Sequence, residues 1–286
     1  MNVIIETITL RDKVGDEKGL EMIKQAGFDG VDFSYYLAPE DYAGYGDDYV
    51  EYAKKLRAKM DELSLKCLQA HAPLNFAYGG EFSLDNKWYK QIVRSIESAS
   101  ILGAPSIVIH VPYIAPDIKI DTIAYFKEYY KTFIPYLEKF KIKLAIENVF
   151  GMDFNTYKMF DVFTDARGFN DFVLSMGENF CACVDVGHAG LVTCPPEEYI
   201  KSLDYGLIKS VHLHDNDCVT DMHTLPFQAS FNWDAIMSAL KDNGYNGAIA
   251  FEVFNFLKKL PNELLDDALK FAYSTIAYLK KLFENQ

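Results

Sequence analysis

The chain has 286 residues, half of them apolar, which suits one α/β barrel with a large buried core. Its net charge of −13 is spread along the chain, so we expect nucleic acid and anionic membranes to repel it. No apolar run is long enough to predict a membrane span, and the first residues lack the basic segment of a secretory signal. The five cysteines are odd in number and their spacings fit no disulfide framework, so we expect a reduced, cytoplasmic protein.

Eight apolar, β-rich runs alternate with eight helical patterns. The strands are expected at Val3–Thr9, Gly30–Tyr35, Lys66–His71, Ser106–Val111, Lys143–Val149, Phe180–Val186, Ile208–Asp215 and Gly247–Val253. The helices are expected at Asp16–Ala26, Asp47–Leu63, Leu84–Leu102, Ile120–Phe140, Asp165–Glu178, Glu197–Leu203, Trp233–Asn243 and Glu263–Phe283. This alternation predicts parallel strands and a single (β/α)8 TIM barrel domain over residues 1–286. An open doubly wound sheet is the rival, but no GxGxxG turn follows the first strand.

The later strands have two different faces. One face is bulky and aliphatic, whereas the other is small or polar and ends in a residue that can bind metal. The small faces read Ser106, Val108 and His110; Lys143, Ala145 and Glu147; Cys181, Cys183 and Asp185; and Ala248, Ala250 and Glu252. We expect the bulky faces to pack on the helices and the small faces to line the lumen. The functional site is then expected at the C-terminal mouth.

Metal-binding side chains stand at or after the ends of six expected strands. They are His71, His110, Glu147, Asp185, His188, His212, Asp221, His223 and Glu252. Any one of them alone would more often be a hydrogen-bonded structural residue. Closure of a barrel, however, brings strand ends together, and several carboxylates in one mouth would repel each other without a cation. We therefore expect a divalent metal, and mixed imidazole and carboxylate ligands suit Zn or Mn better than Ca.

The motifs EN at Glu147–Asn148, DxGH at Asp185–His188, HLHD at His212–Asp215 and the final Glu252 resemble those of the xylose isomerase-like TIM-barrel superfamily. The resemblance covers nearly the whole chain. In its isomerase and epimerase branch, it implies that one divalent metal is bound by Glu147, Asp185, His212 and Glu252. Glu147 and Glu252 would also be the catalytic acid/base groups, and His188 would contact the sugar.

Two further residues are candidates for substrate binding. Asp153 follows Glu147 by six positions, where epimerases carry an acid that contacts substrate, although a loop cap explains it equally well. His214 shares the face of His212 and either binds an anion or makes a local hydrogen bond. Aromatic residues near the strand ends either pack or enclose a sugar: Tyr35, Phe76, Trp88, Tyr113, Phe150 and Phe254.

The second branch that the chain resembles is the endonuclease IV class, which holds three zinc ions. The resemblance implies one site from His71, His110 and Glu147, and a second from Glu147, Asp185, His212 and Glu252. It implies a third from His188, Asp221 and His223. The expected number of metal ions is therefore between one and three.

Two activities follow from the two branches. The first is an isomerase or epimerase that moves a proton on a small sugar or sugar phosphate through an enediolate. Epimerases usually carry an arginine about six residues after the histidine of the seventh strand, where this chain has Cys218. This chain must therefore bind its substrate differently from those epimerases. Family members often pair, so a homodimer is one expected assembly.

The alternative is an endonuclease IV-like phosphoesterase that acts on abasic-site DNA or on a small phosphate ester. The expected loops at residues 37–52 and 215–230 carry acids and no Lys or Arg, which argues against a long nucleic acid. A third interpretation is a binding barrel without catalysis. The presence of so many ligand-type residues at one mouth argues against that.

Overall fold

A computed structural model describes residues 1–74, 82–112, 120–153, 158–160, 163 and 165–285. One eight-stranded parallel sheet runs in the order β10-β1-β2-β3-β4-β5-β8-β9. The strands are β1 Val3–Glu6, β2 Gly30–Ser34, β3 Lys66–His71, β4 Ser106–Val108, β5 Lys143–Glu147, β8 Phe180–Asp185, β9 Ile208–His212 and β10 Ile249–Phe251. A parallel bridge between Leu213 and Phe251 joins the two edge strands, so the sheet closes into the predicted TIM barrel.

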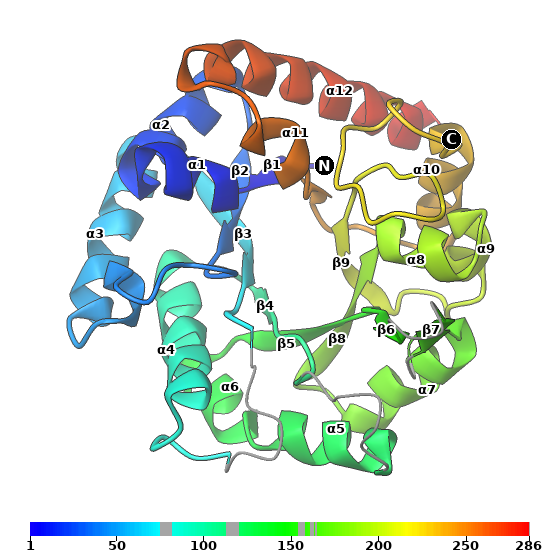
Figure 1. Ribbon diagram of the computed structural model, residues 1–286, viewed down its shortest axis with the longest axis horizontal. Coiled ribbons are helices and arrows are strands. Elements are labelled where there is room, and N and C mark those ends of the chain that lie inside the picture. The colour runs from blue at the N-terminus through cyan, green and yellow to red at the C-terminus, as the bar shows by residue number, and fades with distance from the viewer. Residues whose placement is uncertain (75–81, 113–119, 154–157, 161–162, 164, 286) are drawn as a thin grey trace.

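Helices surround the strands as an outer ring (Figure 1). Those of the ring are α2 Asp16–Ala26, α3 Tyr49–Glu62, α4 Lys87–Leu102, α5 Thr122–Lys131, α6 Ile134–Phe140, α7 Ala166–Met176, α9 Pro196–Lys201, α10 Trp233–Asp242 and α12 Leu265–Asn285. Shorter helices follow β1, β8 and β10: α1 Ile8–Val14, α8 Val186–Val192 and α11 Phe254–Lys258. Two 3₁₀ turns lie at Ala43–Tyr45 and Asn262–Leu264. A small antiparallel hairpin, β6 Gly151–Asp153 with β7 Lys158–Phe160, follows β5.

Several boundaries differ from the sequence prediction, and two of these differences have a clear physical cause. The helix expected at Ile120–Phe140 is divided into α5 and α6, because Pro135 lacks an N–H group and cannot continue a helix from the preceding turn. The first strand ends at Glu6 and not at Thr9. There the Glu6 carboxylate accepts a hydrogen bond from the Ile8 N–H at 2.5 Å, in the first turn of α1. Both differences concern connections and leave the barrel order unchanged.

Strand parity divides the buried side chains into two groups, as predicted. The main core lies between sheet and helices and includes Ile107, Leu144 and Val184. A separate small cluster consists of Val108, Ala145, Cys181 and Cys183, from the other face of the same strands. Inside the barrel, the Ser106 and Ser210 hydroxyls meet at 3.2 Å although two strands separate β4 from β9 in the sheet. The small residues therefore fill the lumen, and the mouth lies above them.

The expectation that the cysteines are all reduced is wrong for one pair. Cys194, after α8, forms a disulfide with Cys218, in the loop after β9, whereas Cys67, Cys181 and Cys183 are free and buried. The sequence signal failed because the partners lie 24 residues apart and only the packing of two loops brings them together. In the part of the chain that the structure describes, no helix is long and apolar enough to cross a membrane.

Candidate metal centre

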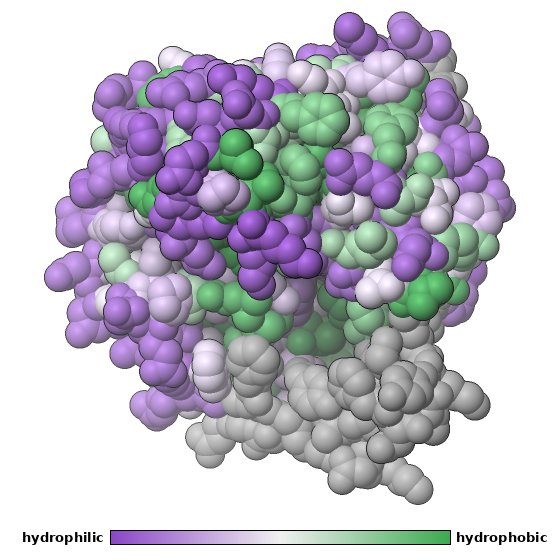
Figure 2. All heavy atoms as spheres, turned by 45° about the horizontal axis from the view of Figure 1, so that its top comes forward, coloured by the Kyte–Doolittle hydropathy of each residue, from purple (hydrophilic) through white to green (hydrophobic). Residues whose placement is uncertain are grey.

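The parallel strands deliver polar side chains to one end of the barrel. His71, Glu147, Asp185 and His212 are the last residues of β3, β5, β8 and β9. His110 follows β4 closely, and Glu252 follows β10 directly. All the residues expected at the mouth come together there in overlapping groups, each able to hold a metal ion. The surface is hollowed near the middle of the molecule, where apolar side chains line part of the wall (Figure 2).

The inner cluster consists of Glu147, Asp185, His212 and Glu252. The His212 Nδ1 atom lies 3.5 Å from Glu147 Oε1, 3.8 Å from Asp185 Oδ2 and 3.4 Å from Glu252 Oε2. One ligand atom from each residue lies within 4.8 Å of the others. These separations exceed a normal hydrogen bond, and they match atoms that surround a common ion at about 2.0–2.2 Å each.

Unpaired buried atoms test whether a metal fits here. Asp185 Oδ2, His212 Nδ1 and Glu252 Oε2 are buried and have no hydrogen-bond partner within the described residues. Buried polar atoms without partners cost free energy, and three of them facing one another need a common partner. Imidazole nitrogen and carboxylate oxygen are ligand atoms that Zn²⁺ and Mn²⁺ bind in proteins. The residues present therefore fit a divalent metal.

A second group, the histidine cluster, shares Glu147 with the inner cluster and adds His71 and His110. Glu147 Oε2 lies 2.7 Å from His110 Nε2 and 3.5 Å from His71 Nε2. The other oxygen, Oε1, faces His212 of the inner cluster. Oε1 also lies 3.1 Å from His188 Nδ1, so Glu147 presents one oxygen to the histidine cluster and the other to His212 and His188.

The loop cluster is the third group: His188 from α8, with His214, Asp221 and His223 from the loop after β9. Asp221 Oδ2 lies 3.0 Å from His223 Nε2 and 3.7 Å from His188 Nε2, and Asp221 Oδ1 lies 3.8 Å from His214 Nε2. The sequence left two alternatives for His214, an anion-binding role or a local hydrogen bond, and its Nε2 atom lies 3.0 Å from Asp185 Oδ1. The structure places it in this cluster, stacked on His223 with ring centroids 3.8 Å apart.

The local structure around Asp185 explains the DxGH motif. The Asp185 carboxylate is the N-cap of α8 and accepts from the His188 N–H at 2.6 Å. Asn148 holds the same residue from β5, since its side chain pairs with both the Asp185 N–H and the Asp185 carbonyl. A Cβ atom at Gly187 would overlap the His214 imidazole, so glycine is required there by close approach.

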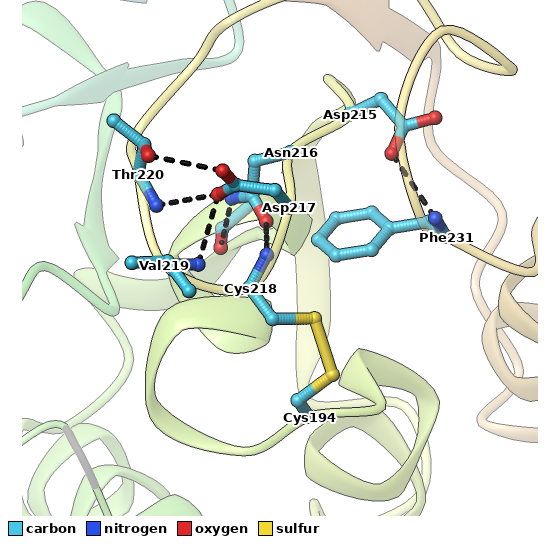
Figure 3. The surroundings of a disulfide bond; sticks show 9 residues. Cys194, Asp215, Asn216, Asp217, Cys218, Val219, Thr220 and Phe231 are labelled. Carbon is cyan, nitrogen blue, oxygen red and sulfur yellow. Dashed lines mark hydrogen bonds between the residues drawn. A yellow bond between two sulfur atoms is a disulfide. The ribbon is translucent and has the colours of Figure 1, made fainter.

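The loop after β9 is held by a buried carboxylate and by the disulfide. Asp215 accepts hydrogen bonds from the N–H groups of Phe227, Ala229 and Phe231 and from the Trp233 indole, at 2.9–3.3 Å. Figure 3 shows this carboxylate pointing toward Phe231, and the Cys194–Cys218 disulfide below the turn that follows it. These contacts fix the segment that carries Asp221 and His223.

Sequence reasoning missed Asp32 of β2. Its Oδ2 atom lies 3.5 Å from His71 Nδ1 and 3.4 Å from His212 Nε2, the ring nitrogens that point away from the clusters. The Gln69 amide donates to the same oxygen at 2.8 Å. A carboxylate behind a ligating imidazole fixes its tautomer and orientation. The sequence signal for Asp32 was weak, because it consists of a single acidic residue on the lumen face of a strand that is buried throughout.

Imidazoles and carboxylates at the mouth shift one another's pKa values. Burial would lower the pKa of His71, but Asp32 and Glu147 raise it to about 9. Burial would raise the pKa of the Asp221 carboxyl, but His188 and His223 hold it below its usual value. Burial and the nearby Glu252 raise the pKa of Glu6, at the end of β1, to about 8. Protonated imidazoles thus offset the carboxylates, and a divalent cation that displaces those protons does the same.

Other candidates from the sequence lie as follows. Asp153 lies in β6, whose backbone the structure describes but whose side chains it does not. Phe76 and Tyr113 fall outside the described residues. Phe254 stacks on His223 at 4.1 Å and Phe150 meets His188 edge-on at 5.1 Å, so both border the loop cluster.

Comparison with known proteins agrees with this architecture. A model of the xylose isomerase-like TIM barrel family matches residues 20–275. An uncharacterized protein of Sinorhizobium fredii, y4fM, is 25% identical over 271 residues, which cover 83% of this chain and 81% of that one. Among solved structures, a D-tagatose 3-epimerase-like protein has a TM-score of 0.76 at 19% identity and covers 100% of this chain and 99% of its own.

Two other solved structures contain bound groups. A D-allulose 3-epimerase from Methylomonas in complex with D-allulose has a TM-score of 0.74 at 14% identity and covers 98% and 96% of the two chains. The IOLI protein with a bound zinc atom has a TM-score of 0.69 at 18% identity and covers 98% of both. The fold and its buried clusters define a TIM barrel with a candidate metal centre at its mouth. The chain belongs to the xylose isomerase-like TIM barrel family.

Proposed function

We propose that this protein is a divalent-metal-dependent isomerase or epimerase of a small sugar or sugar phosphate. The observation that carries the proposal is the inner cluster, in which two glutamates flank His212 and Asp185 with ligand atoms left unpaired. The similar epimerase structures support a ketose as the substrate class. The nine residues named from the sequence are the proposed ligands of one to three ions, with zinc or manganese as the metal.

The two glutamates have a role beyond holding metal. A bound divalent ion would polarise a carbonyl and an adjacent hydroxyl of the sugar, which acidifies the intervening C–H bond. Glu147 ends β5 and Glu252 follows β10 directly, and one oxygen of each lies 3.4–3.5 Å from His212 Nδ1. One carboxylate can remove the proton and the other can return it on the opposite face, so the carbon is inverted through an enediolate.

Proton exchange tests this chemistry directly. D-tagatose, D-allulose and their phosphates are incubated with the manganese- or zinc-loaded protein in deuterated water. We expect deuterium at the carbon next to the carbonyl for at least one sugar. Glu252→Gln should abolish exchange, whereas Glu263→Gln, at an exposed carboxylate of the last 3₁₀ turn, should not change it. Wild-type exchange in the Glu252→Gln variant, with metal still bound, would exclude the acid/base role.

A second candidate, a multi-zinc phosphoesterase, is favoured by one specific observation. Glu147 presents separate oxygens to the inner and histidine clusters, and the loop cluster lies beside them. Such a shared carboxylate suits neighbouring ions that together stabilise an in-line displacement at phosphorus. The acidic loop after β9 argues against a long nucleic acid as substrate. A small phosphate ester satisfies both observations.

Metal stoichiometry separates the two candidates. Elemental analysis of the purified protein should give close to one ion per chain for the isomerase. Close to three zinc ions, together with hydrolysis of bis(p-nitrophenyl) phosphate and no sugar exchange, would instead establish the phosphoesterase. Absence of bound metal after incubation with zinc and manganese would exclude both.

A further inference from the structure

Tyr36 is the one tyrosine, among the described residues, that lies against the histidine cluster. Its ring centroid is 6.0 Å from that of His71 and 5.6 Å from that of His110, in tilted and edge-on contact. The side chain is half-buried. Its hydroxyl has no hydrogen-bond partner in the part of the chain that the structure describes.

Other tyrosines of the same region behave differently. The hydroxyls of Tyr42 and Tyr52 donate to Asp16, and the Tyr45 hydroxyl donates to the Tyr35 carbonyl. Tyr35 itself, which the sequence suggested as a wall of a sugar pocket, is 2% exposed and packs on Phe33 in the core. Asp32 and Ser34 belong to β2, whereas Tyr36 lies in the turn that follows the strand. Tyr36, not Tyr35, therefore reaches the mouth.

The backbone of Tyr36 is fixed from two sides. Its N–H donates to Ser34 Oγ at 3.2 Å, and its carbonyl accepts from Arg11 Nη1 at 3.0 Å. The same Arg11 nitrogen donates to the Ser34 carbonyl at 2.8 Å, and the Arg11 side chain is only 3% exposed. A buried guanidinium that binds two carbonyls restrains the loop after β2. The backbone that carries the phenol is thus held in place.

We propose that Tyr36 is a substrate-binding residue, whose hydroxyl donates a hydrogen bond to an oxygen of the sugar above the metal centre, and that Arg11 positions it. This inference rests on the proposed isomerase function. A phenol hydroxyl is protonated at neutral pH and can donate a hydrogen bond. A donor at this position selects a hydroxyl or carbonyl oxygen of the ligand.

The test compares Tyr36→Phe with wild type on D-tagatose and D-allulose. Loss of one neutral hydrogen bond should raise KM about tenfold, equivalent to about 1.4 kcal/mol, with a smaller change in kcat. Elemental analysis should find the metal content unchanged, since no ligand atom is removed. The control is Tyr49→Phe, which removes a half-buried hydroxyl whose partner is Glu97 on α4.

Three outcomes are distinguishable. Unchanged KM and kcat in Tyr36→Phe, with an active wild type, would overturn the inference and leave the proposed function standing. Loss of metal from Tyr36→Phe would also overturn it, because the ring would then act by supporting His71 and His110. If calorimetry and exchange show that wild type neither binds nor converts either sugar or its phosphate, the proposed function fails and the inference fails with it.

Discussion

The inner cluster and the loop cluster lie side by side but are built differently. Glu147, Asp185 and His212 end strands of the barrel, and Asp185 and His212 are completely buried. In the loop cluster, Asp221 keeps 31% of its side chain exposed and comes from an irregular segment. Strand ends are fixed by hydrogen bonds to both neighbouring strands, whereas a loop needs its own supports.

The difference shows how each cluster is kept in position. Asp32 orients His71 and His212 from inside the barrel. The loop cluster depends instead on the four hydrogen bonds to Asp215, on the Cys194–Cys218 disulfide and on the Asn216 amide, which donates to the Gly187 carbonyl at 2.9 Å. We therefore expect the inner cluster to tolerate loop changes, and the loop cluster to respond to them.

The largest effect is expected from His212→Ala. This change removes the imidazole that faces all three carboxylates of the inner cluster. Sugar exchange should fall by about a thousandfold or more, because charge stabilisation by the metal is worth several kcal/mol. Elemental analysis should show loss of the inner ion. Full metal content with full activity would contradict the assignment of the inner cluster.

The next effect is expected from Asp32→Asn. The amide keeps the shape but loses the charge that orients His71 and His212. Metal affinity should fall about 10- to 100-fold, the usual result of removing an outer partner of a ligating histidine. Competition with a chelator measures the change, and Asp29→Asn on the loop before β2 is the comparison variant. Equal affinity in wild type and Asp32→Asn would show that Asp32 is dispensable.

A smaller effect is expected from Asp221→Asn. This residue lies 3.0–3.8 Å from the three histidines of the loop cluster. If the isomerase uses the inner ion alone, exchange should fall by less than about tenfold, and the zinc content should fall by one ion at most. A loss as large as that of His212→Ala would show that the loop cluster is essential to the chemistry.

The smallest effect is expected from reduction of the disulfide. A phosphine reductant should weaken metal binding at the loop cluster a few-fold, because the segment carrying Asp221 and His223 gains freedom. Metal binding at the inner cluster should not change. The double variant Cys194→Ser/Cys218→Ser is the control, since the reductant should have no effect on it. Equal loss of metal from both clusters would erase the distinction between them.

The sequence by itself determined the barrel and the residues that meet at its mouth. Strand periodicity of two put Val108, Ala145, Cys181 and Cys183 in the lumen, where the structure has them. The same parity pointed Glu147 and Asp185 to the C-terminal end, because closure leaves the ends of parallel strands no other place to converge. These properties follow from local, periodic patterns of residues, so they can be predicted from a single sequence.

Only the tertiary structure decided which residues support the site. Asp32 lies behind two histidines from distant strands, His214 stacks on His223, and Cys194 pairs with Cys218. Each contact depends on how separate segments pack together, and the periodic pattern of apolar residues in the sequence does not predict such packing. Tyr36, and not Tyr35, lies at the mouth for the same reason. The two tyrosines are adjacent in sequence, and only the turn after β2, held by the Arg11 hydrogen bonds to the Ser34 and Tyr36 carbonyls, places Tyr36 against His110.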